Sequence, residues 1–196
     1  MENKTIISFI PAYDQVKNAA SSRIRVYYPN ESINTFYSNE FESSIGYNPK
    51  AHVLIIQKRI DEFSLKCLRE FQGLKIFDFD DPVYGHTGFR ETIDLCHVVT
   101  TDTEGRKQQF DSLNLNKPCV VLEDCLDYGL NESLPVLDFN DKLVWFGNRE
   151  NINSVSWILN EIIKNNYSLD IISNPLGVQL PPQIKEITWG FDTFID

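Results

Sequence analysis

The chain has 196 residues, of which 42% are hydrophobic and 12% are aromatic, so it carries enough apolar surface for a packed core and is not expected to be disordered. Single domains cluster at roughly 100–150 residues, so this length predicts one large domain or one domain and part of another. The formal net charge of −10 at pH 7 argues against nucleic acid as a partner and weakens any electrostatic hold on anionic lipid, because both are negatively charged.

Apolar runs alternate with amphipathic stretches between residues 5 and 122. Strands are predicted at 5–10, 53–57, 74–79, 98–101 and 119–122, and helices at 19–28, 61–71, 89–95 and 104–113. Pro29 is expected to end the first helix. Strands separated by helices are typical of βαβ units and a parallel sheet. We therefore predict an α/β fold, with a doubly wound, Rossmann-like domain over residues 1–138.

Residues 123–140 are rich in Asp, Glu, Asn and Pro and have the character of a linker. A second unit is predicted to follow, with strands at 142–146, 169–172 and 184–189 and a helix at 151–164. Residues 139–196 would then form the beginning of a second Rossmann-like α/β unit. Roughly half a domain buries too little surface to be stable alone. We therefore expect this incomplete unit to be stabilised by packing against the first domain, another copy of the chain or a complementary C-terminal half.

Cysteine and histidine usage predicts no zinc site. Cys67, Cys96, Cys119 and Cys125 form no Cys-x-x-Cys pair, and the three histidines are scattered. The cysteines are expected to be reduced, partly buried thiols. The apolar run at 5–10 is too short for a signal peptide, and no stretch approaches the roughly 20 apolar residues of a membrane span. The expected location is the cytoplasm.

Carboxylates gather after the strand predicted at 74–79. In open parallel sheets ligands bind beyond the carboxyl ends of the strands, where Asp78, Asp80 and Asp81 are expected to lie. Carboxylates this close together raise one another's pKa, or hold a cation or sugar hydroxyls. The alternative is that Asp80 or Asp81 caps the turn that Pro82 requires.

Two arginines follow the first strand. Arg23 and Arg25 come directly after Ser21 and Ser22 and are candidate contacts for a phosphate or carboxylate group of a substrate. The alternative is that they are solvated arginines paired with surface acids. Thr101, at the end of another strand, is a further candidate for substrate binding at the same edge.

Three more residues are candidates on weaker signals. His86 lies in a glycine-containing loop after the aspartates and could act as a general base, or could simply be bonded to its surroundings. Gly147 and Arg149 lie at the first strand-to-helix turn of the second unit, where a glycine permits a phosphate to approach the backbone, or forms a plain turn. The aromatic side chains within 34–47 are expected to stack on a ligand or to cover a core.

Several short segments, in this order along the chain, resemble those of one enzyme family. The segments are Ser21-Ser22-Arg23-Ile24-Arg25, Lys75-Ile76-Phe77-Asp78-Phe79-Asp80-Asp81-Pro82-Val83-Tyr84, Cys96-His97-Val98-Val99-Thr100-Thr101-Asp102-Thr103, Lys117-Pro118-Cys119-Val120-Val121-Leu122 and Leu143-Val144-Trp145-Phe146-Gly147. They resemble the GT-B glycosyltransferases of bacterial polysaccharide assembly, of the group-1, family-4-like type. In that family a Ser-Arg-x-Arg start, an Asp-x-Asp-Asp strand end and a Trp/Phe-Gly opening of the donor domain recur.

The resemblance implies transfer of a sugar from a nucleotide-sugar donor to a glycan or lipid-linked acceptor in surface polysaccharide synthesis, at the inner face of the cell membrane. It implies no metal and no other cofactor. The front domain would hold the acceptor, with Asp80 and Asp81 lining the cleft, and Gly147 would approach the donor diphosphate. The family's main donor-binding residues lie later in its second domain than Asp196, so we expect a truncated gene, a fragment or one part of a split enzyme.

Two alternatives remain open. The run from Ile76 to Asp81 also resembles the nucleophile motif of the haloacid-dehalogenase phosphatases, in which Asp78 would attack phosphorus, Asp80 would act as acid and base, and a late pair, here Glu123 and Asp124, would hold Mg²⁺. Pro82 and the short spacing of these motifs depart from that pattern. The second alternative is a catalytically inactive interaction module.

Overall fold

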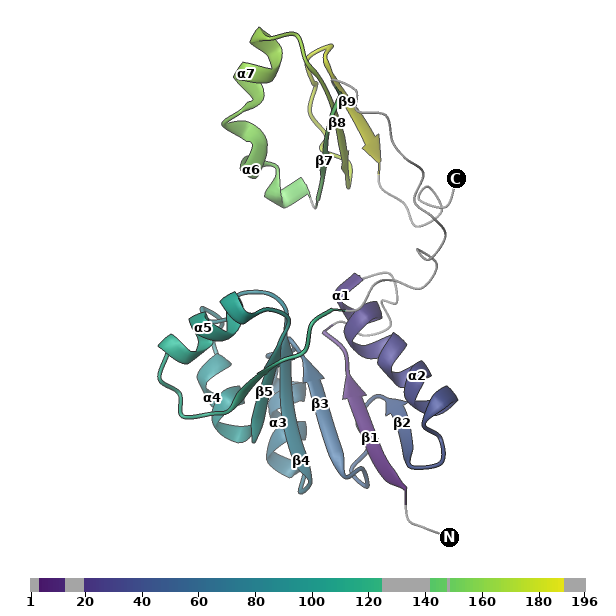
Figure 1. Ribbon diagram of the computed structural model, residues 1–196. Helices are drawn as coiled ribbons and strands as arrows, with labels where there is room; N and C mark the ends of the chain where they lie inside the picture. Colours follow the sequence, from purple (N-terminus) through teal and green to yellow (C-terminus); the bar gives the residue numbers. More distant parts are fainter. Residues whose placement is uncertain (1–3, 13–19, 125–141, 148, 189–196) are drawn as a thin grey trace. The chain divides into compact units, whose positions relative to one another are not determined.

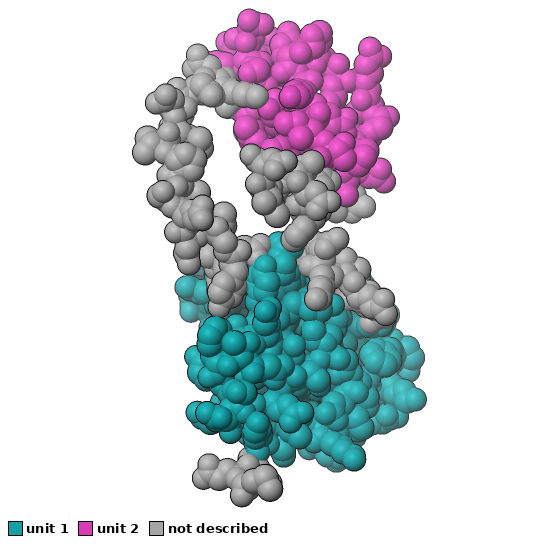
Figure 2. Space-filling model, turned by 90° about the vertical axis from the view of Figure 1, so that its right-hand side faces the viewer, with its two compact units in different colours: residues 1–132 teal, residues 133–196 magenta. Residues whose placement is uncertain are grey.

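The computed structural model describes residues 4–12, 20–124, 142–147 and 149–188. The chain divides into two compact units, residues 1–132 and 133–196 (Figure 2). The predicted domain boundary between residues 138 and 139 lies outside the described residues and stays a prediction.

The first unit is built on a parallel sheet of six strands in the order β2-β1-β3-β4-β5-β6 (Figure 1). The strands are β1 (Thr5–Ile10), β2 (Phe41–Ile45), β3 (Val53–Gln57), β4 (Leu74–Phe79), β5 (Val98–Thr101) and β6 (Cys119–Val121). The chain runs from β1 outward to the edge strand β2 and then returns to β3 on the other side of β1. The direction of winding therefore reverses between β1 and β3, and the carboxyl ends of these two strands form the topological switch point at which such sheets bind ligands.

Helices cover both faces of this sheet, which confirms the doubly wound α/β prediction (Figure 1). The crossovers from β3 to β6 contain α3 (Glu62–Glu70), α4 (Phe89–Leu95) and α5 (Glu104–Ser112), all on one face. The opposite face is covered, over β1 and β2, by a continuous helical segment made of α1 (Ala20–Ser22), η1 (Arg23–Tyr27) and α2 (Tyr28–Phe36).

The main core lies under α3, α4 and α5. Alternate residues of the strands point into it, so that Leu54 and Ile56 of β3 and Phe77 and Phe79 of β4 are fully buried. The ring of Phe77 meets that of Phe89 edge-on, with 6.5 Å between centroids. The intervening residues of the same strands face the other side of the sheet, and these residues form the candidate site described below.

The first helix does not end at Pro29 as predicted. Residues Arg23–Tyr27 form a π turn, in which the backbone N–H of Tyr28 donates to the carbonyl of Arg23, and α2 continues through Pro29. Pro29 lies in the first turn of α2, where a missing backbone N–H removes no α-helical hydrogen bond. The widened π turn before it accommodates the ring, and π turns of this kind are frequent at functional sites.

Strand β2 was not predicted from the sequence. Its central residue, Ser43, exchanges hydrogen bonds with the Asn34 side chain of α2, with Ser43 N to Oδ1 and Nδ2 to Ser43 O both at 2.9 Å. The nearby aromatic residues have divided roles. Tyr47 packs edge-on against Phe71 at the margin of the core, whereas Phe36 is largely exposed.

Three of the four cysteines are described, and the prediction for them is confirmed. Cys67, Cys96 and Cys119 are free and buried. Burial raises the pKa of Cys96 to about 12 and that of Cys119 to about 11, so neither thiol is ionised at neutral pH. Cys125 lies outside the described residues.

Helix α3 begins with a capping box. The Asp61 carboxylate accepts from the backbone N–H of Ser64 at 2.8 Å, and the Ser64 hydroxyl is 3.0 Å from the backbone N–H of Asp61. Burial alone would raise the pKa of Asp61, but the bonds from Ser64 and from Arg59 outweigh it and hold this pKa below its usual value.

We expect Asp61→Ala to lower the free energy of unfolding at pH 7 by about 1 kcal/mol, the usual cost of losing an N-cap. Because the folded-state pKa of Asp61 is depressed, its charged form stabilises the protein above the unfolded pKa of about 4, and this contribution is lost as the pH falls. Urea denaturation at pH 7 and pH 3 should therefore show a smaller difference between wild type and Asp61→Ala at the lower pH. Asp61→Asn, which keeps a capping oxygen, is the control. A difference that does not shrink at low pH would contradict this account.

The second unit contains a parallel sheet of three strands in the order β7-β8-β9 (Figure 1). The strands are β7 (Lys142–Phe146), β8 (Ser168–Ser173) and β9 (Ile184–Thr188), and the helical pieces between β7 and β8 are η2 (Arg149–Asn151), α6 (Asn153–Ser156) and α7 (Leu159–Lys164). The prediction of a small second α/β unit is thus confirmed. Among the described residues, no helix of either unit is long and apolar enough to cross a membrane.

The predicted single helix over 151–164 is wrong, because the structure breaks it into three short pieces. The Ser156 hydroxyl donates to the carbonyl of Asn153 at 2.8 Å, and Ile158 N bonds to Val155 O at 3.0 Å in a tighter, three-residue turn. Local side-chain bonds of this kind compete with the regular helical pattern. The break still leaves Val155 and Ile162 buried in the small core of this unit.

Candidate functional site

The carboxyl edge of the six-stranded sheet holds a buried ion pair between Arg25 and Asp78. Arg25 lies on the π turn and Asp78 on β4. Arg25 Nε donates to Asp78 Oδ2 at 2.7 Å and Nη2 to Oδ1 at 2.5 Å, a bidentate arrangement. The two side chains are only 5% and 6% exposed. This pair ties the helical segment to the centre of the sheet.

Further contacts complete the environment of this pair. Arg25 Nη1 donates to the carbonyl of Leu122 at 3.0 Å and to Asp124 Oδ1 at 2.5 Å. The Thr100 hydroxyl donates to Asp78 Oδ1 at 2.6 Å. Burial alone would lower the pKa of Arg25, but its bonds to Asp78 and Asp124 outweigh burial and raise the pKa above its usual value. Arg25 therefore stays charged at neutral pH.

Lys58 forms a second charged group at the same edge. It follows β3, and its Nζ lies 2.9 Å from Asp80 Oδ1, 2.6 Å from Asp81 Oδ2 and 3.0 Å from the Ser21 hydroxyl. Burial opposes the charge of Lys58, but the bonds to Asp81 and Asp80 raise its pKa. Burial raises the pKa of Asp80 above its usual value, against the lowering effect of Lys58. Asp81 is different, because its side chain is 65% exposed.

The backbone of Lys58 is unusual. Its φ of 50° lies in the left-handed region that residues with a side chain seldom adopt. Its N–H donates to the carbonyl of Asp78 at 2.7 Å, which continues the pairing of β3 and β4 past the end of the strand. Backbone strain of this kind is often found at functional sites.

Gln57 lies at the switch point between β1 and β3 and is fully buried. Its Oε1 accepts from the backbone N–H of Ala12 at 3.2 Å and from the Ser22 hydroxyl at 2.9 Å. Its Nε2 is buried and has no hydrogen-bond partner within the parts of the chain that the structure describes. A buried amide nitrogen without a partner is costly, so this group is a candidate donor to a ligand.

Neither Gln57 nor Lys58 is among the predicted site residues. Gln57 ends a predicted strand, and Lys58 follows it at the edge where ligands were expected. Their partners, among them Ser21 and Ser22, lie far away in the sequence and are brought close by the crossover from β1 to β2.

The structure brings the three predicted aspartates and Arg25 to one edge, as expected. It does so by pairing each aspartate with a cation, so the carboxylates do not face one another unscreened. Arg23 lies half-buried on the same π turn. Thr101 is fully buried, and its hydroxyl donates to Asp102 at 3.2 Å, which favours a structural role over substrate contact.

His86 is not brought to this edge. It is exposed and lines a separate surface hollow with Tyr84, Phe89, Arg90 and neighbouring residues. Its backbone closes a turn, with His86 N bonded to Val83 O and Phe89 N bonded to His86 O, both at 3.0 Å. The geometry therefore supports the loop interpretation of His86 more than the general-base one.

Gly147 and Arg149 belong to the second unit. A Cβ on Gly147 would lie 2.8 Å from the indole ring of Trp145, so the glycine makes room for this side chain. The indole N–H donates to Ser154 at 3.2 Å and so fastens the turn to α6. Arg149 donates to the carbonyl of Pro175 at 3.4 Å. Both residues thus have structural partners at the turn where donor contacts were predicted.

The phosphatase alternative requires Asp78 and Asp124 to share a metal ion. Arg25 instead donates to both carboxylates, so its guanidinium holds the position between them. Asp78 is also buried, and both of its oxygens accept hydrogen bonds from Arg25, so the bidentate pair would have to break before this carboxylate could attack phosphorus. The residues present therefore do not fit that chemistry.

Neither a scan of protein-family models nor a search of curated proteins finds a match to this chain.

Proposed function

We propose that the chain is the acceptor-side unit, with the start of the donor-side unit, of a GT-B-type glycosyltransferase. The single observation that carries the proposal is the set of hydrogen-bonding groups at the switch point of the sheet. It combines the Gln57 Nε2 group, which has no partner among the described residues, with the Ser21 hydroxyl, Lys58 and the carboxylates of Asp80 and Asp81. Sugar hydroxyls both donate and accept, so a mixture of amide, hydroxyl and carboxylate groups is complementary to them.

The order of motifs supports the same function. Four of the five segments that resemble the family contain a strand, β4, β5, β6 or β7, and the carboxyl end at which ligands of such sheets bind. The fifth, Ser21–Arg25, lies in the helical segment that reaches the same edge through Arg25. On this proposal the partners are a nucleotide-sugar and a glycan or lipid-linked acceptor, and transfer takes place in the cytoplasm at the inner face of the cell membrane. Asp80 and Asp81 contact the acceptor, and Gly147 and Arg149 lie toward the donor diphosphate.

Saturation-transfer NMR on the whole chain tests the proposal with glucose, galactose, N-acetylglucosamine, UDP-glucose and GDP-mannose as probes. We expect signals from the sugar ring protons of at least one probe. Gln57→Met should reduce these signals strongly, because it removes the free amide donor and keeps a side chain of similar length.

Gln72→Met, at an exposed glutamine of the same unit, is the matched control and should bind like wild type. Circular dichroism must show that Gln57→Met is folded, since the loss of the acceptor for Ser22 and Ala12 costs about 1–3 kcal/mol. The proposal fails if no probe binds the wild-type chain, or if Gln57→Met binds as wild type does.

A further inference from the structure

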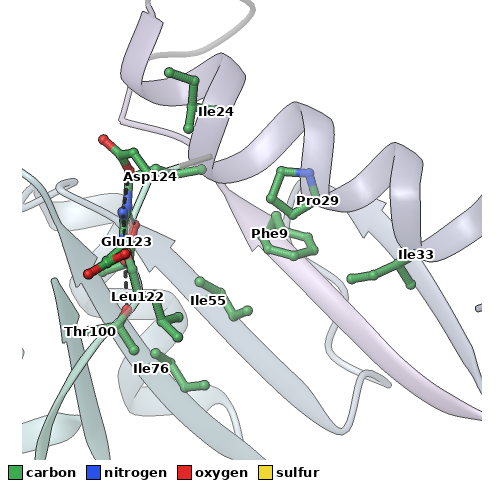
Figure 3. Close-up of a pocket in the computed structure, with 12 residues that line it drawn as sticks. Phe9, Ile24, Pro29, Ile33, Ile55, Ile76, Thr100, Leu122, Glu123 and Asp124 are labelled. Atoms are coloured by element: carbon green, nitrogen blue, oxygen red, sulfur yellow. Dashed lines mark hydrogen bonds and ion pairs between the residues drawn. The ribbon is translucent and has the colours of Figure 1, made fainter. Parts of the chain in front are cut away.

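A cavity of about 320 Å³ lies beside the Arg25–Asp78 pair, between the helical segment and strands β1, β3 and β4 of the sheet (Figure 3). Ile24, Pro29 and Ile33 approach it from the helical side, and Phe9, Ile55 and Ile76 lie opposite on β1, β3 and β4. These walls are apolar. The volume lies at the lower end of the range of roughly 300–1,000 Å³ that small-molecule sites span.

One end of the cavity is polar and acidic. Arg25, Asp78, Thr100, Glu123 and Asp124 line it (Figure 3). The Nε, Nη1 and Nη2 atoms of Arg25 all donate to protein acceptors, so the guanidinium is already committed. The carboxylates of Asp78 and Asp124 are paired with this one cation, and Glu123 adds a third carboxylate to the lining. Those of Glu123 and Asp124 remain accessible, since Glu123 is exposed and the Asp124 side chain is 40% exposed.

We infer that this cavity binds a small amphiphilic amine, with its hydrocarbon body against the isoleucines and its protonated amino group at Glu123 and Asp124. The apolar walls favour a hydrocarbon and gain free energy with each methylene group that leaves water. The surplus of carboxylates favours a cationic head that donates hydrogen bonds and disfavours an anionic one. The net charge of −10 acts in the same direction at longer range.

Charge also decides against a second copy of the chain as the occupant. A copy would bring its own net charge of −10 to an acidic rim, and the two would repel each other. A phosphate-bearing amphiphile is disfavoured for the same reason. Binding of an amine in this cavity does not depend on whether the protein transfers sugars.

Calorimetric titration of the full chain with butylamine, pentylamine and hexylamine tests the inference, with hexyl phosphate as the anionic counterpart. We expect the affinity to rise about fourfold per methylene group, and hexyl phosphate to bind far more weakly than hexylamine. Glu123→Gln should weaken hexylamine binding by up to about fivefold, while Glu42→Gln, at an exposed glutamate on the far edge of the sheet, should leave it unchanged.

Ile33→Trp, which fills the cavity from its helical wall, should abolish the dependence on chain length. Leu113→Trp is the matched control. Leu113 is an exposed leucine at the C-terminal end of α5 and does not line the cavity, so this variant should keep the dependence of affinity on chain length. The inference is overturned if hexylamine binds Ile33→Trp as it binds wild type, or if hexyl phosphate binds as tightly as hexylamine. It is also overturned if sedimentation shows a dimer that Ile33→Trp dissociates, because a second copy would then occupy the cavity.

Discussion

Replacing Arg25 by methionine is expected to lower the free energy of unfolding by about 3–5 kcal/mol, the usual cost of removing one partner of a buried ion pair. The variant leaves Asp78 only 4% exposed and without its bidentate partner. It also removes the bond from Arg25 to the carbonyl of Leu122, and so releases the helical segment from the end of β6. Urea denaturation at pH 7 measures the loss.

Two controls separate charge burial from lost packing. Arg69→Met removes an arginine that is 45% exposed and paired with Glu91 and Glu62, so it should cost no more than about 1 kcal/mol. The double variant Arg25→Met, Asp78→Leu removes both buried charges and should recover most of the stability. A single variant as stable as wild type, or a double variant less stable than Arg25→Met, would contradict the assignment of Arg25 and Asp78 as a structural pair.

The central strands of the sheet were predictable because each is a short segment dominated by apolar residues, between segments with a helical pattern. The run Val53–Gln57 coincides with β3, and Leu74–Phe79 with β4. Strand β2 was not predictable in this way, because Phe41–Ile45 contains a glutamate and two serines. It lies at the sheet edge, where one side is open to water, and Ser43 is held by Asn34 of a helix and not by an apolar partner.

The helical segment before β2 shows the limit of a local rule. A proline inside a helical pattern normally ends the helix. The π turn from Arg23 to Tyr27 removes the conflict by changing the hydrogen-bond spacing before Pro29. The same turn places Arg25 over β4, so the exception to the local rule also creates the buried ion pair.

The candidate site was predictable as a location but not as a set of pairs. Parallel strands end at one edge, so Asp78, Asp80 and Asp81 were expected together there. Which cation each carboxylate meets depends on the crossovers, and these place Arg25 on Asp78 and Lys58 on the other two. Nearness in sequence did not bring His86 to the aspartates, because the turn from Val83 to His86 places it at a different hollow.

The second large effect, a loss of transfer rate, is expected at Asp81. If the proposed function is correct, the Asp81 carboxylate contacts the acceptor and acts in catalysis, and it does not serve to stabilise the fold. Asp81→Asn should lower the rate of sugar transfer by about a hundredfold or more, the usual contribution of a positioned acid or base. Its stability should change by less than about 1 kcal/mol, because the Asp81 side chain is 65% exposed and a surface ion pair contributes little. Lys58 keeps Asp80 as a partner in this variant, so no buried charge is left unpaired.

The measurement is the initial rate of sugar transfer by the complete enzyme that carries the whole donor-side unit, with thermal unfolding of the same samples. Asp111→Asn is the matched control, since Asp111 is also an exposed aspartate paired with a lysine, Lys107, and lies on α5 away from the edge. It should change neither the rate nor the stability appreciably. If Asp81→Asn lost stability and rate together, Asp81 would be the cap of the turn before Pro82. If it kept its rate, the proposed catalytic role would be wrong, and the carboxylates at this edge would serve only to hold Lys58 and Arg25 in place.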